Sequence, residues 1–243
     1  MTPALHRRRV VLLLAVTLAS SAGCARLLTR PTRGATGDAA AIVAAGAARE
    51  QALSGLRLTL SVRATAGPPA ARLASPAYLA IDDAEHLRLQ VLSPFGVTVL
   101  DLTTSGDTFT LALPMRGESK SGRIDLAALA AGTTPDDERM IVALALLFRP
   151  KMDRARCRAA GATAVSCTVA PDLTATIAVD QALRTVRQDF VGPGGRPLFS
   201  AVLEDYTSTA RDALPGRITI SDGQGGPALV IRVVKAARGE QKT

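Results

Sequence analysis

The sequence predicts a mainly β protein in which one strongly curved antiparallel sheet of about eleven strands carries a few helices. Three observations predict this class. Short runs of alternating apolar and polar residues recur along the chain, as in strands that bury one face. Turns rich in glycine and proline separate these runs at short intervals, which favours antiparallel neighbours. One helical insertion divides the strands into two groups, and a single sheet accommodates both groups better than two domains would.

Residues 1–23 have the three parts of an export signal. Arginines at positions 7–9 form a basic start, an apolar run covers residues 10–19, and small residues precede Cys24. The apolar run is too short for a bilayer span, which needs about 20 residues. The cysteine after Ala-Gly resembles the bacterial lipobox, which implies diacylglycerol on Cys24, cleavage before it, and fatty acylation of the new amine. An ordinary secretory signal with a chance cysteine is the alternative, because Ser21 stands where such motifs usually have leucine.

Residues 24–37 are predicted to form a lipidated, flexible tether. They have no regular apolar period, and Arg26, Arg30 and Arg33 place positive charge where lipid phosphates would lie. Position 25 holds alanine. In lipoprotein sorting of the enterobacterial type an aspartate there retains the product in the inner membrane. The lack of aspartate at position 25 therefore implies, by resemblance, an anchor in the outer membrane facing the periplasm.

The folded domain is predicted to cover residues 38–237, and a polar tail follows at 238–243. Asp38 can cap an alanine-rich helix over residues 39–53. The period then changes to two, and residues 56–64 form the clearest amphipathic strand of the chain. Further strands of this first group are predicted over residues 71–81, in a hairpin over 86–103, and over 107–113.

The hairpin over residues 86–103 organises this group. Ser93, Pro94, Phe95 and Gly96 form its predicted turn. Phenylalanine is unusual at a turn tip, because tips lie in water, and the chain has only five. Phe95 should therefore either fold back on the core or face something apolar outside. We take the second interpretation, in which this turn is a membrane-contact or delivery loop.

Two helices interrupt the strands after a polar excursion over residues 114–123. The first is predicted over 125–131 and the second over 135–149, with Thr134 as its cap. The body of the second helix, residues 140–148, is apolar all round, so it has to be buried, and it is too short to span a bilayer. We expect it to plug or cover an apolar concavity.

The strands resume after this insertion. They are predicted over residues 155–158, 164–169, 173–179, 183–190, 198–206, 217–221 and 229–234. Cys157 and Cys167 flank the first turn of this second group. In an oxidising envelope compartment they are candidates for a disulfide, and two buried free thiols are the alternative.

Composition argues against several function classes. The chain has no tryptophan and 3% aromatic residues, so it offers few surfaces for stacking on bases or sugars. The net charge is +8, about +5 without the signal, and the charges are interspersed. Such a surface tolerates anionic lipids better than it forms a track for nucleic acid, so no nucleic-acid partner is expected.

Residues that carry catalysis or bind metals are scarce. Of the two histidines, His6 lies in the signal and His86 opens a strand, where histidine is most often a surface residue. The chain has no serine nucleophile elbow, HExxH pattern, paired CxxC motif or Walker-type loop. We expect a protein that is not an enzyme and binds neither cofactor nor metal. An envelope hydrolase would need a cluster of polar residues converging on His86.

An apolar interior below a buried helix suits a container for acyl chains. Methylenes are recognised by the hydrophobic effect without specific chemistry, at about 0.8 kcal/mol each. The candidate cavity or lid residues lie on the predicted strands or on the apolar helix. They are Leu58, Leu60, Leu89, Val91, Phe109, Leu111, Met140, Ile141, Leu144, Leu147 and Phe148.

Residues 87–111, LRLQVLSPFGVTVLDLTTSGDTFTL, look like the central region of the LolB family of outer-membrane lipoprotein receptors. Residues 214–235, LPGRITISDGQGGPALVIRVVK, are similar to its final hairpin. The lipobox, the two helices and the number of strands fit as well, whereas the tryptophans common in LolB are missing.

The resemblance implies an incomplete barrel whose mouth is plugged by helices and whose apolar cavity holds the acyl chains of lipoproteins. It also implies a periplasmic LolA-like carrier as donor and outer-membrane lipids as the destination. Phe95 stands where LolB has an exposed leucine that assists delivery. We expect a monomer. The alternative is a structural or assembly lipoprotein whose curved sheet binds a protein partner.

Overall fold

The computed structural model describes residues 39–65, 72–83, 85–148, 156–208, 210, 213–223 and 227–238. Residues 36–243 make up one compact unit. The predicted export signal, Cys24 and the tether lie outside the described residues, so they remain predictions from the sequence.

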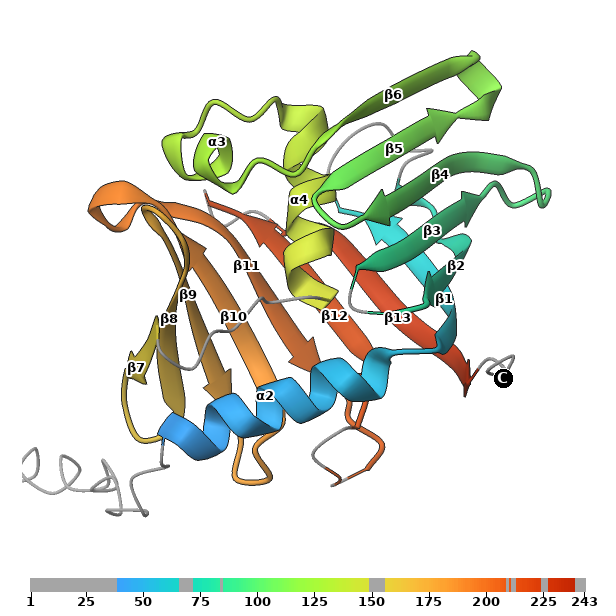
Figure 1. Ribbon diagram of the computed structural model, residues 1–243. Helices are drawn as coiled ribbons and strands as arrows, with labels where there is room; N and C mark the ends of the chain where they lie inside the picture. The colour runs from blue at the N-terminus through green and yellow to red at the C-terminus, as the bar shows by residue number, and fades with distance from the viewer. Residues whose placement is uncertain are drawn as a thin grey trace, which may run out of the picture. The chain divides into compact units, whose positions relative to one another are not determined.

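One antiparallel sheet of thirteen strands makes up most of the described chain, and it does not close (Figure 1). Its order is β6-β5-β4-β3-β2-β1-β13-β12-β11-β10-β9-β8-β7. The first and last strands therefore pair in the middle of the sheet, and β6 and β7 are its two edges. The first group comprises β1 (Leu56–Ala64), β2 (Ser75–Ile81), β3 (His86–Leu92), β4 (Thr98–Ser105), β5 (Thr108–Leu113) and β6 (Glu118–Arg123). The second comprises β7 (Cys157–Ala159), β8 (Ala164–Ala170), β9 (Leu173–Val179), β10 (Thr185–Val191), β11 (Pro197–Glu204), β12 (Arg217–Asp222) and β13 (Pro227–Arg238).

The predicted class of a mainly β chain with one curved antiparallel sheet is confirmed. β1 has the predicted bounds, with Leu58 and Leu60 buried and Arg57 and Arg63 exposed. This alternation follows because successive side chains of a strand point to opposite faces of the sheet. Helix α2 (Ala39–Leu53) also forms where the alanine-rich segment predicted it.

The number of strands differs from the prediction, and β6 is one reason. The polar excursion contains a short 3-10 turn, η2 (Pro114–Arg116), followed by β6, which pairs with β5. Nearly all β6 side chains are exposed, so the strand shows no alternation of apolar and polar residues. An edge strand with little to bury has no hydrophobic signature, and its charged residues discourage pairing with a second chain.

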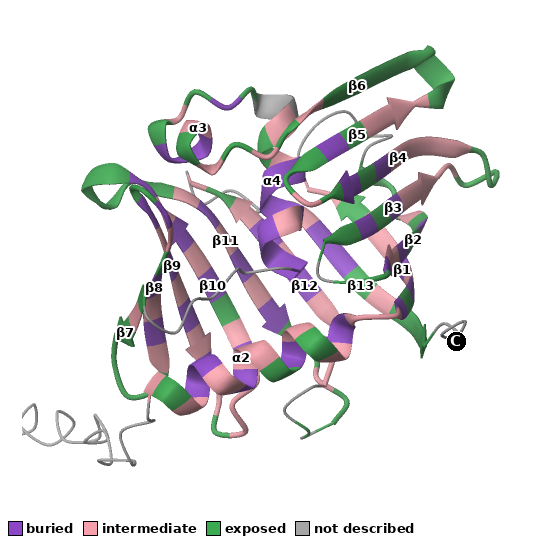
Figure 2. Cartoon of the chain, viewed as in Figure 1, coloured by how far each residue is buried: buried purple, intermediate pink, exposed green. Residues whose placement is uncertain are grey.

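Helix α4 (Asp136–Phe148) lies on the concave side of the sheet, as its apolar body predicted (Figure 1). Its residues from Ile141 onward are mostly buried (Figure 2). The shorter helix α3 (Leu126–Ala131) precedes it. Asp125 caps α3 by accepting hydrogen bonds from the N–H groups of Ala127 and Ala128, each at 2.9 Å.

Helix α2 runs along one end of the second strand group (Figure 1). Ile42 and Val43 of α2 pack with Val165 and Ile177 of the sheet in one apolar cluster. Cys157 of β7 and Cys167 of β8 lie opposite each other in the register and are joined by a disulfide. The bridge thus holds the short edge strand β7 beside the helix that covers it.

Candidate functional site

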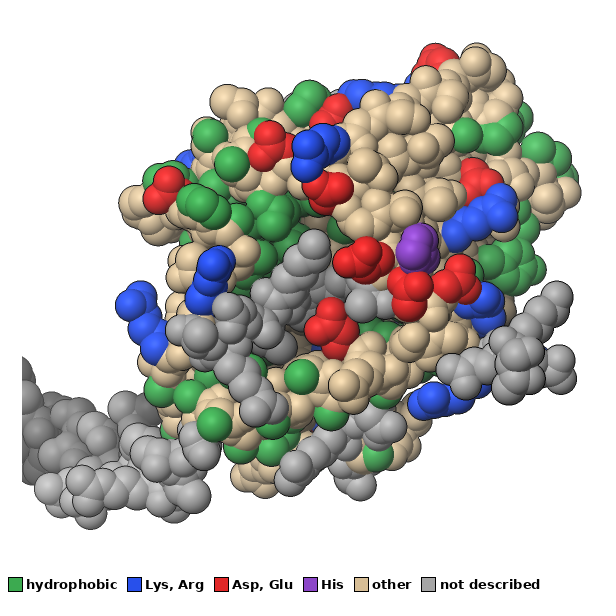
Figure 3. Space-filling model, in the orientation of Figure 1, with side chains coloured by type: hydrophobic (Ala, Val, Ile, Leu, Met, Phe, Trp, Pro, Cys, Tyr) green, Lys and Arg blue, Asp and Glu red, His purple; other side chains and the backbone are tan. Residues whose placement is uncertain are grey.

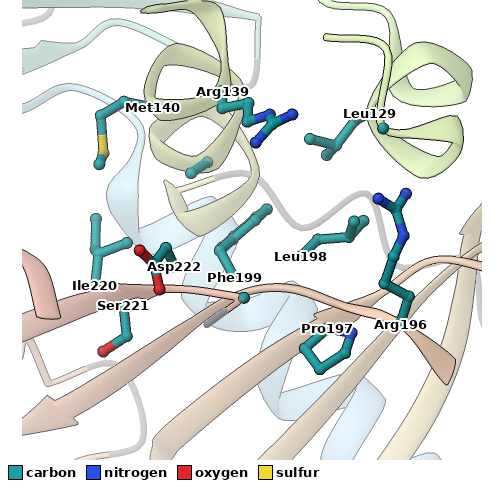
Figure 4. A pocket seen from close by; sticks show the side chains of 13 residues that line it. Leu129, Arg139, Met140, Arg196, Pro197, Leu198, Phe199, Ile220, Ser221 and Asp222 are labelled. Atoms are coloured by element: carbon teal, nitrogen blue, oxygen red, sulfur yellow. The ribbon is translucent and has the colours of Figure 1, made fainter. Parts of the chain in front are cut away.

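A cleft of about 460 Å³ lies between the helices α3 and α4 on one side and the strands β11 and β12 on the other (Figure 4). Its lining comes from both sides and is mixed, with apolar side chains together with those of Arg139, Arg196, Ser221 and Asp222. Leu129 belongs to α3, Met140 and Ala143 belong to the first turns of α4, and Phe199 and Ile220 project from the sheet. The inward faces of β11 and β12 supply the last two, because strand side chains alternate between the two faces.

The floor of the cleft is rigidly packed. The ring of Phe199 stacks on that of Phe190, with centroids 4.4 Å apart and an interplanar angle of 20°. These residues lie directly opposite each other on β10 and β11. Such cross-strand aromatic pairs contribute about 0.5–1.5 kcal/mol beyond their burial. The apolar floor therefore exists before any ligand enters.

Two exposed guanidinium groups lie at the mouth of the cleft (Figure 4). Arg196 donates a hydrogen bond of 2.6 Å to the carbonyl oxygen of Ala130, in the last turn of α3. Gly132 ends that helix with φ 78°, and a Cβ there would overlap the Arg196 guanidinium, so glycine makes this contact possible. Arg139 donates to the carbonyl oxygen of Thr134 at 3.1 Å.

This arrangement can hold an amphiphilic molecule, with an apolar tail inside and polar groups at the guanidinium groups. The cleft volume lies within the range of about 300–1,000 Å³ that is usual for small-molecule sites. It is roughly three times the cavity of about 150 Å³ that holds one benzene molecule. The space therefore suits about one acyl chain rather than several.

Comparisons with known proteins bear on the fold. No family model matches the sequence, and no curated protein matches it. Among the solved structures that match is a LolA superfamily protein from Nitrosomonas europaea, with a TM-score of 0.53 and 13% identity over 84% of this chain and 94% of that one. Another is a domain from Vibrio parahaemolyticus described as an outer membrane lipoprotein-sorting protein, with a TM-score of 0.55 and 11% identity over 85% and 95%.

The chain has a LolA-like open-barrel fold. Within this fold, ten of the eleven residues expected to form the cavity or its lid do not line the cleft; Met140 alone of that set does. The others are buried in, or packed against, one core cluster that fills the concavity. The reason is the position of α4, which plugs the concavity as expected and whose Leu144 and Leu147 pack in that cluster.

The expected delivery loop lies at an exposed hairpin tip. Phe95 is 93% exposed, so it does not fold back on the core. The Ser93 hydroxyl accepts hydrogen bonds from the N–H groups of Phe95 at 3.3 Å and Val97 at 3.2 Å. Gly96 takes a φ of 80°, which glycine adopts without strain. Pro94 is exposed as well. The turn is therefore held in one conformation by its own hydrogen bonds.

His86 lies apart from the cleft, at the start of β3. Its Nδ1 is 2.8 Å from a carboxylate oxygen of Asp83, and both side chains are about half exposed. The N–H of Glu85 and then the imidazole of His86 lower the pKa of Asp83 below its usual value by hydrogen bonding. Among the residues that the structure describes, no three His, Cys, Asp or Glu side chains are grouped to hold a metal ion.

Within the described ranges, no helix has both the length and the apolar character that crossing a bilayer requires.

Local sequence patterns did not indicate most of the cleft. Leu129, Arg196, Phe199 and Ile220 were not among the candidates, although each lines it. The glycine-rich turn before Arg196 is typical of a hairpin and does not by itself indicate a site. Nothing in a local pattern brings residue 129 close to residue 220, so this site depends on the tertiary fold.

Proposed function

We propose that this protein is a LolB-like lipoprotein that binds acyl chains of lipoproteins and helps to insert them into the outer membrane. Lipid on Cys24 anchors it, and a periplasmic LolA-like carrier supplies the cargo. The cleft below α3 and α4 is the observation that carries this proposal. The LolA-like fold, the export signal and the lipobox support it.

The chemistry of the cleft suits transfer rather than permanent storage. Each buried methylene contributes about 0.8 kcal/mol to binding. The guanidinium groups of Arg139 and Arg196 at the mouth can donate to ester carbonyl oxygens of a lipid. The bilayer offers an acyl chain the same kind of contact as the apolar side chains of the cleft do. A modest difference in affinity between cleft and bilayer then sets the direction of transfer.

Phe95 supports the delivery step, because it is a large apolar side chain held in solvent. Phe95→Glu should leave folding unchanged, since surface substitutions usually have small effects on stability. It should slow insertion, since a charge is costly where a membrane is entered. A transfer assay with reconstituted donor and acceptor membranes measures the rate, and an unchanged rate would argue against delivery by this tip.

Mass spectrometry of lipid that copurifies with the full chain tests the cleft itself. We expect acylated molecules with the wild-type protein and fewer with Met140→Trp, whose larger side chain fills the cleft. Val234→Trp is the control, because it places the same tryptophan at a side chain that is 66% exposed and outside the cleft. Equal amounts of lipid in the two variants, or no lipid with folded wild-type protein, would contradict acyl binding there.

The second candidate function is a structural or assembly role in which the outer face of the sheet binds a protein. One observation favours it. Tyr78 is 49% exposed beside a shallow hollow of about 250 Å³ that Arg57, Arg88 and Lys235 also line. A stable protein complex after gentle extraction, with no bound lipid, would support this alternative over the first.

A further inference from the structure

Four of the six large hydrophobic side chains exposed among the described residues lie at one end of the sheet. These are Leu73, Phe95, Val97 and Met115, which we call the apolar rim. The antiparallel meander explains why. The β1–β2, β3–β4 and β5–β6 connections all fall at the same end of the strands, because each strand reverses direction once (Figure 1).

The β5–β6 tip lies beside the β3–β4 tip. In the pair β4 and β5, Asp101 lies opposite Ala112. Met115 comes two residues after the end of β5 and Val97 directly precedes β4, so both lie at this end of the strand pair. The turn η2, which carries Met115, contacts β4. Two separate hairpins thus present exposed apolar side chains side by side.

Leu73 extends the apolar rim on the other side of the β3–β4 tip. Ala77 of β2 lies opposite Val91 of β3, and Leu73 precedes the start of β2, so Leu73 lies at the end of the sheet from which the β3–β4 turn projects. Figure 3 shows hydrophobic side chains gathered at the edge where the β3–β4 and β5–β6 turns lie. The apolar rim is therefore a line of tips and not a single exposed residue.

The backbone of the tips suits an apolar surrounding. Ser93 donates its N–H to the carbonyl oxygen of Val97 at 2.7 Å, and Gly96 donates to the carbonyl oxygen of Ser93 at 3.0 Å. In the second tip Gly117 donates to the carbonyl oxygen of Pro114 at 3.2 Å. Unpaired N–H groups are penalised in hydrocarbon, so a turn that pairs them internally enters a bilayer interface at lower cost.

The mouth of the cleft lies at the same end of the sheet. Arg196 comes just before β11 begins, and Asp222 is the last residue of β12. Both are therefore at the end where β13 begins. Leu229, near the start of β13, pairs with Ala64, the last residue of β1 before the β1–β2 connection. The apolar rim and the cleft mouth accordingly face in the same general direction along the strands.

We propose that the apolar rim is a bilayer-docking surface with two inserting tips, Phe95 and Met115, which turns the cleft mouth toward lipid. This inference rests on the proposed function and names the bilayer as the partner of the rim. The rim side chains stand on separate projecting tips and line none of the hollows described above, which fits penetration into lipid better than a protein-binding groove.

Charge at the tips is compatible with anionic lipid. Arg72 and Arg116 are exposed beside the rim, and Glu118 is the acidic residue nearest to Met115 in the sequence. The described tips therefore carry a small excess of positive charge. Basic residues next to inserted apolar ones are attracted to the negative surface of phospholipid bilayers.

The absence of tryptophan from the chain makes a direct test possible. Three single-tryptophan variants of the full chain, Phe95→Trp, Met115→Trp and Val234→Trp, are reconstituted into vesicles of phosphatidylethanolamine and phosphatidylglycerol with brominated acyl chains. Bromine quenches tryptophan fluorescence on contact. We expect quenching and blue-shifted emission at positions 95 and 115. Val234 is the control, because it is 66% exposed but lies in the bulge between β1 and β13, away from the rim.

A second variant measures whether the two tips cooperate. Met115→Glu, added to Phe95→Trp, should reduce the lipid contact of Trp at position 95. Losing one buried apolar side chain weakens partition into lipid by about tenfold. If Met115→Trp does not fold, Arg116→Trp reports on the same tip.

The outcomes separate this inference from the proposed function. Quenching at position 95 alone overturns the two-tip surface and leaves acyl binding standing. Quenching at position 234 as well overturns the orientation. No quenching at either tip, while lipid still copurifies with the wild-type protein, overturns docking by the rim but not the cleft. Tips that are shielded in a protein dimer without lipid also overturn it.

Discussion

The two halves of the sheet use the same helix in different ways. Over β1–β5 the large side chains of α4, such as Leu144 and Leu147, fill the concavity completely enough to leave Leu79 and Leu102 only 2% exposed. Over β11 and β12 the first turns of α4 present the small side chain of Ala143 and leave a cleft. One helix thus provides stability where it is bulky and binding space where it is small.

Removing a core side chain from the filled half should have the largest effect. Leu79→Ala should lower the free energy of unfolding by about 3–5 kcal/mol, because it opens a cavity that rigid neighbours cannot close. Met140→Ala should cost less, about 1 kcal/mol, since Met140 is only half buried beside an existing cleft. Urea unfolding with unchanged m-values measures both. Equal losses would show that the two halves do not differ in packing.

The disulfide should come next, and it acts on the half that contains the cleft. Replacing Cys157 and Cys167 together by alanine should cost about 2–3 kcal/mol, the value expected for closing a loop over a sequence separation of 10. Reduction of the wild-type protein should lower its thermal midpoint to that of the double variant. A reductant that leaves the midpoint unchanged would contradict this estimate.

Arg196→Ala should loosen the mouth of the cleft by a smaller amount. The hydrogen bond from Arg196 to Ala130 joins β11 to the end of α3, and losing a charged donor costs about 1–2 kcal/mol. Amide hydrogen exchange should become faster in α3 and stay unchanged in β3 of the filled half. Arg187→Ala, which removes an exposed ion pair with Asp189, is the control and should leave α3 unchanged.

The smallest effect concerns acid on the filled half. Hydrogen bonds from Arg88, and also from Gln90, hold the pKa of Asp101 below its usual value. A depressed pKa in the folded state stabilises the protein above the unfolded value of about 3.9 and loses that effect as the pH falls through the folded pKa. Asp101→Asn should therefore be less stable at pH 7 by up to about 1 kcal/mol. The difference should vanish at lower pH; a gap that persists there would refute it.

Sequence patterns predicted the elements that bury one face or are buried completely. The alternation in β1 identified its bounds, because polar and apolar side chains sort to opposite faces of a half-buried strand. The apolar run in α4 indicated burial, since no face of it could remain in water. Phe95 also points outward into solvent, which was the second of the two positions predicted for it.

The cleft could not be predicted from such patterns, because it depends on which distant segments meet. Met140 and Ile220 face the same space although eighty positions separate them, and periodicity reports only local geometry. The cavity candidates were chosen for being apolar, and apolar residues fill cores far more often than they line hollows. What distinguishes the cleft is the small side chain of Ala143 on α4. The residue pattern of a strand does not indicate how large the side chains of the facing helix are.

Because β1 pairs with β13, the sheet can be completed only after the last strand has been made. The strand that enters the sheet first in synthesis finds its second neighbour only when the last strand is made, and contacts so distant in sequence form slowly. Until then β1 has one open edge and the two strand groups are not joined. Such an order leaves the polypeptide incompletely folded until its last strand has been made.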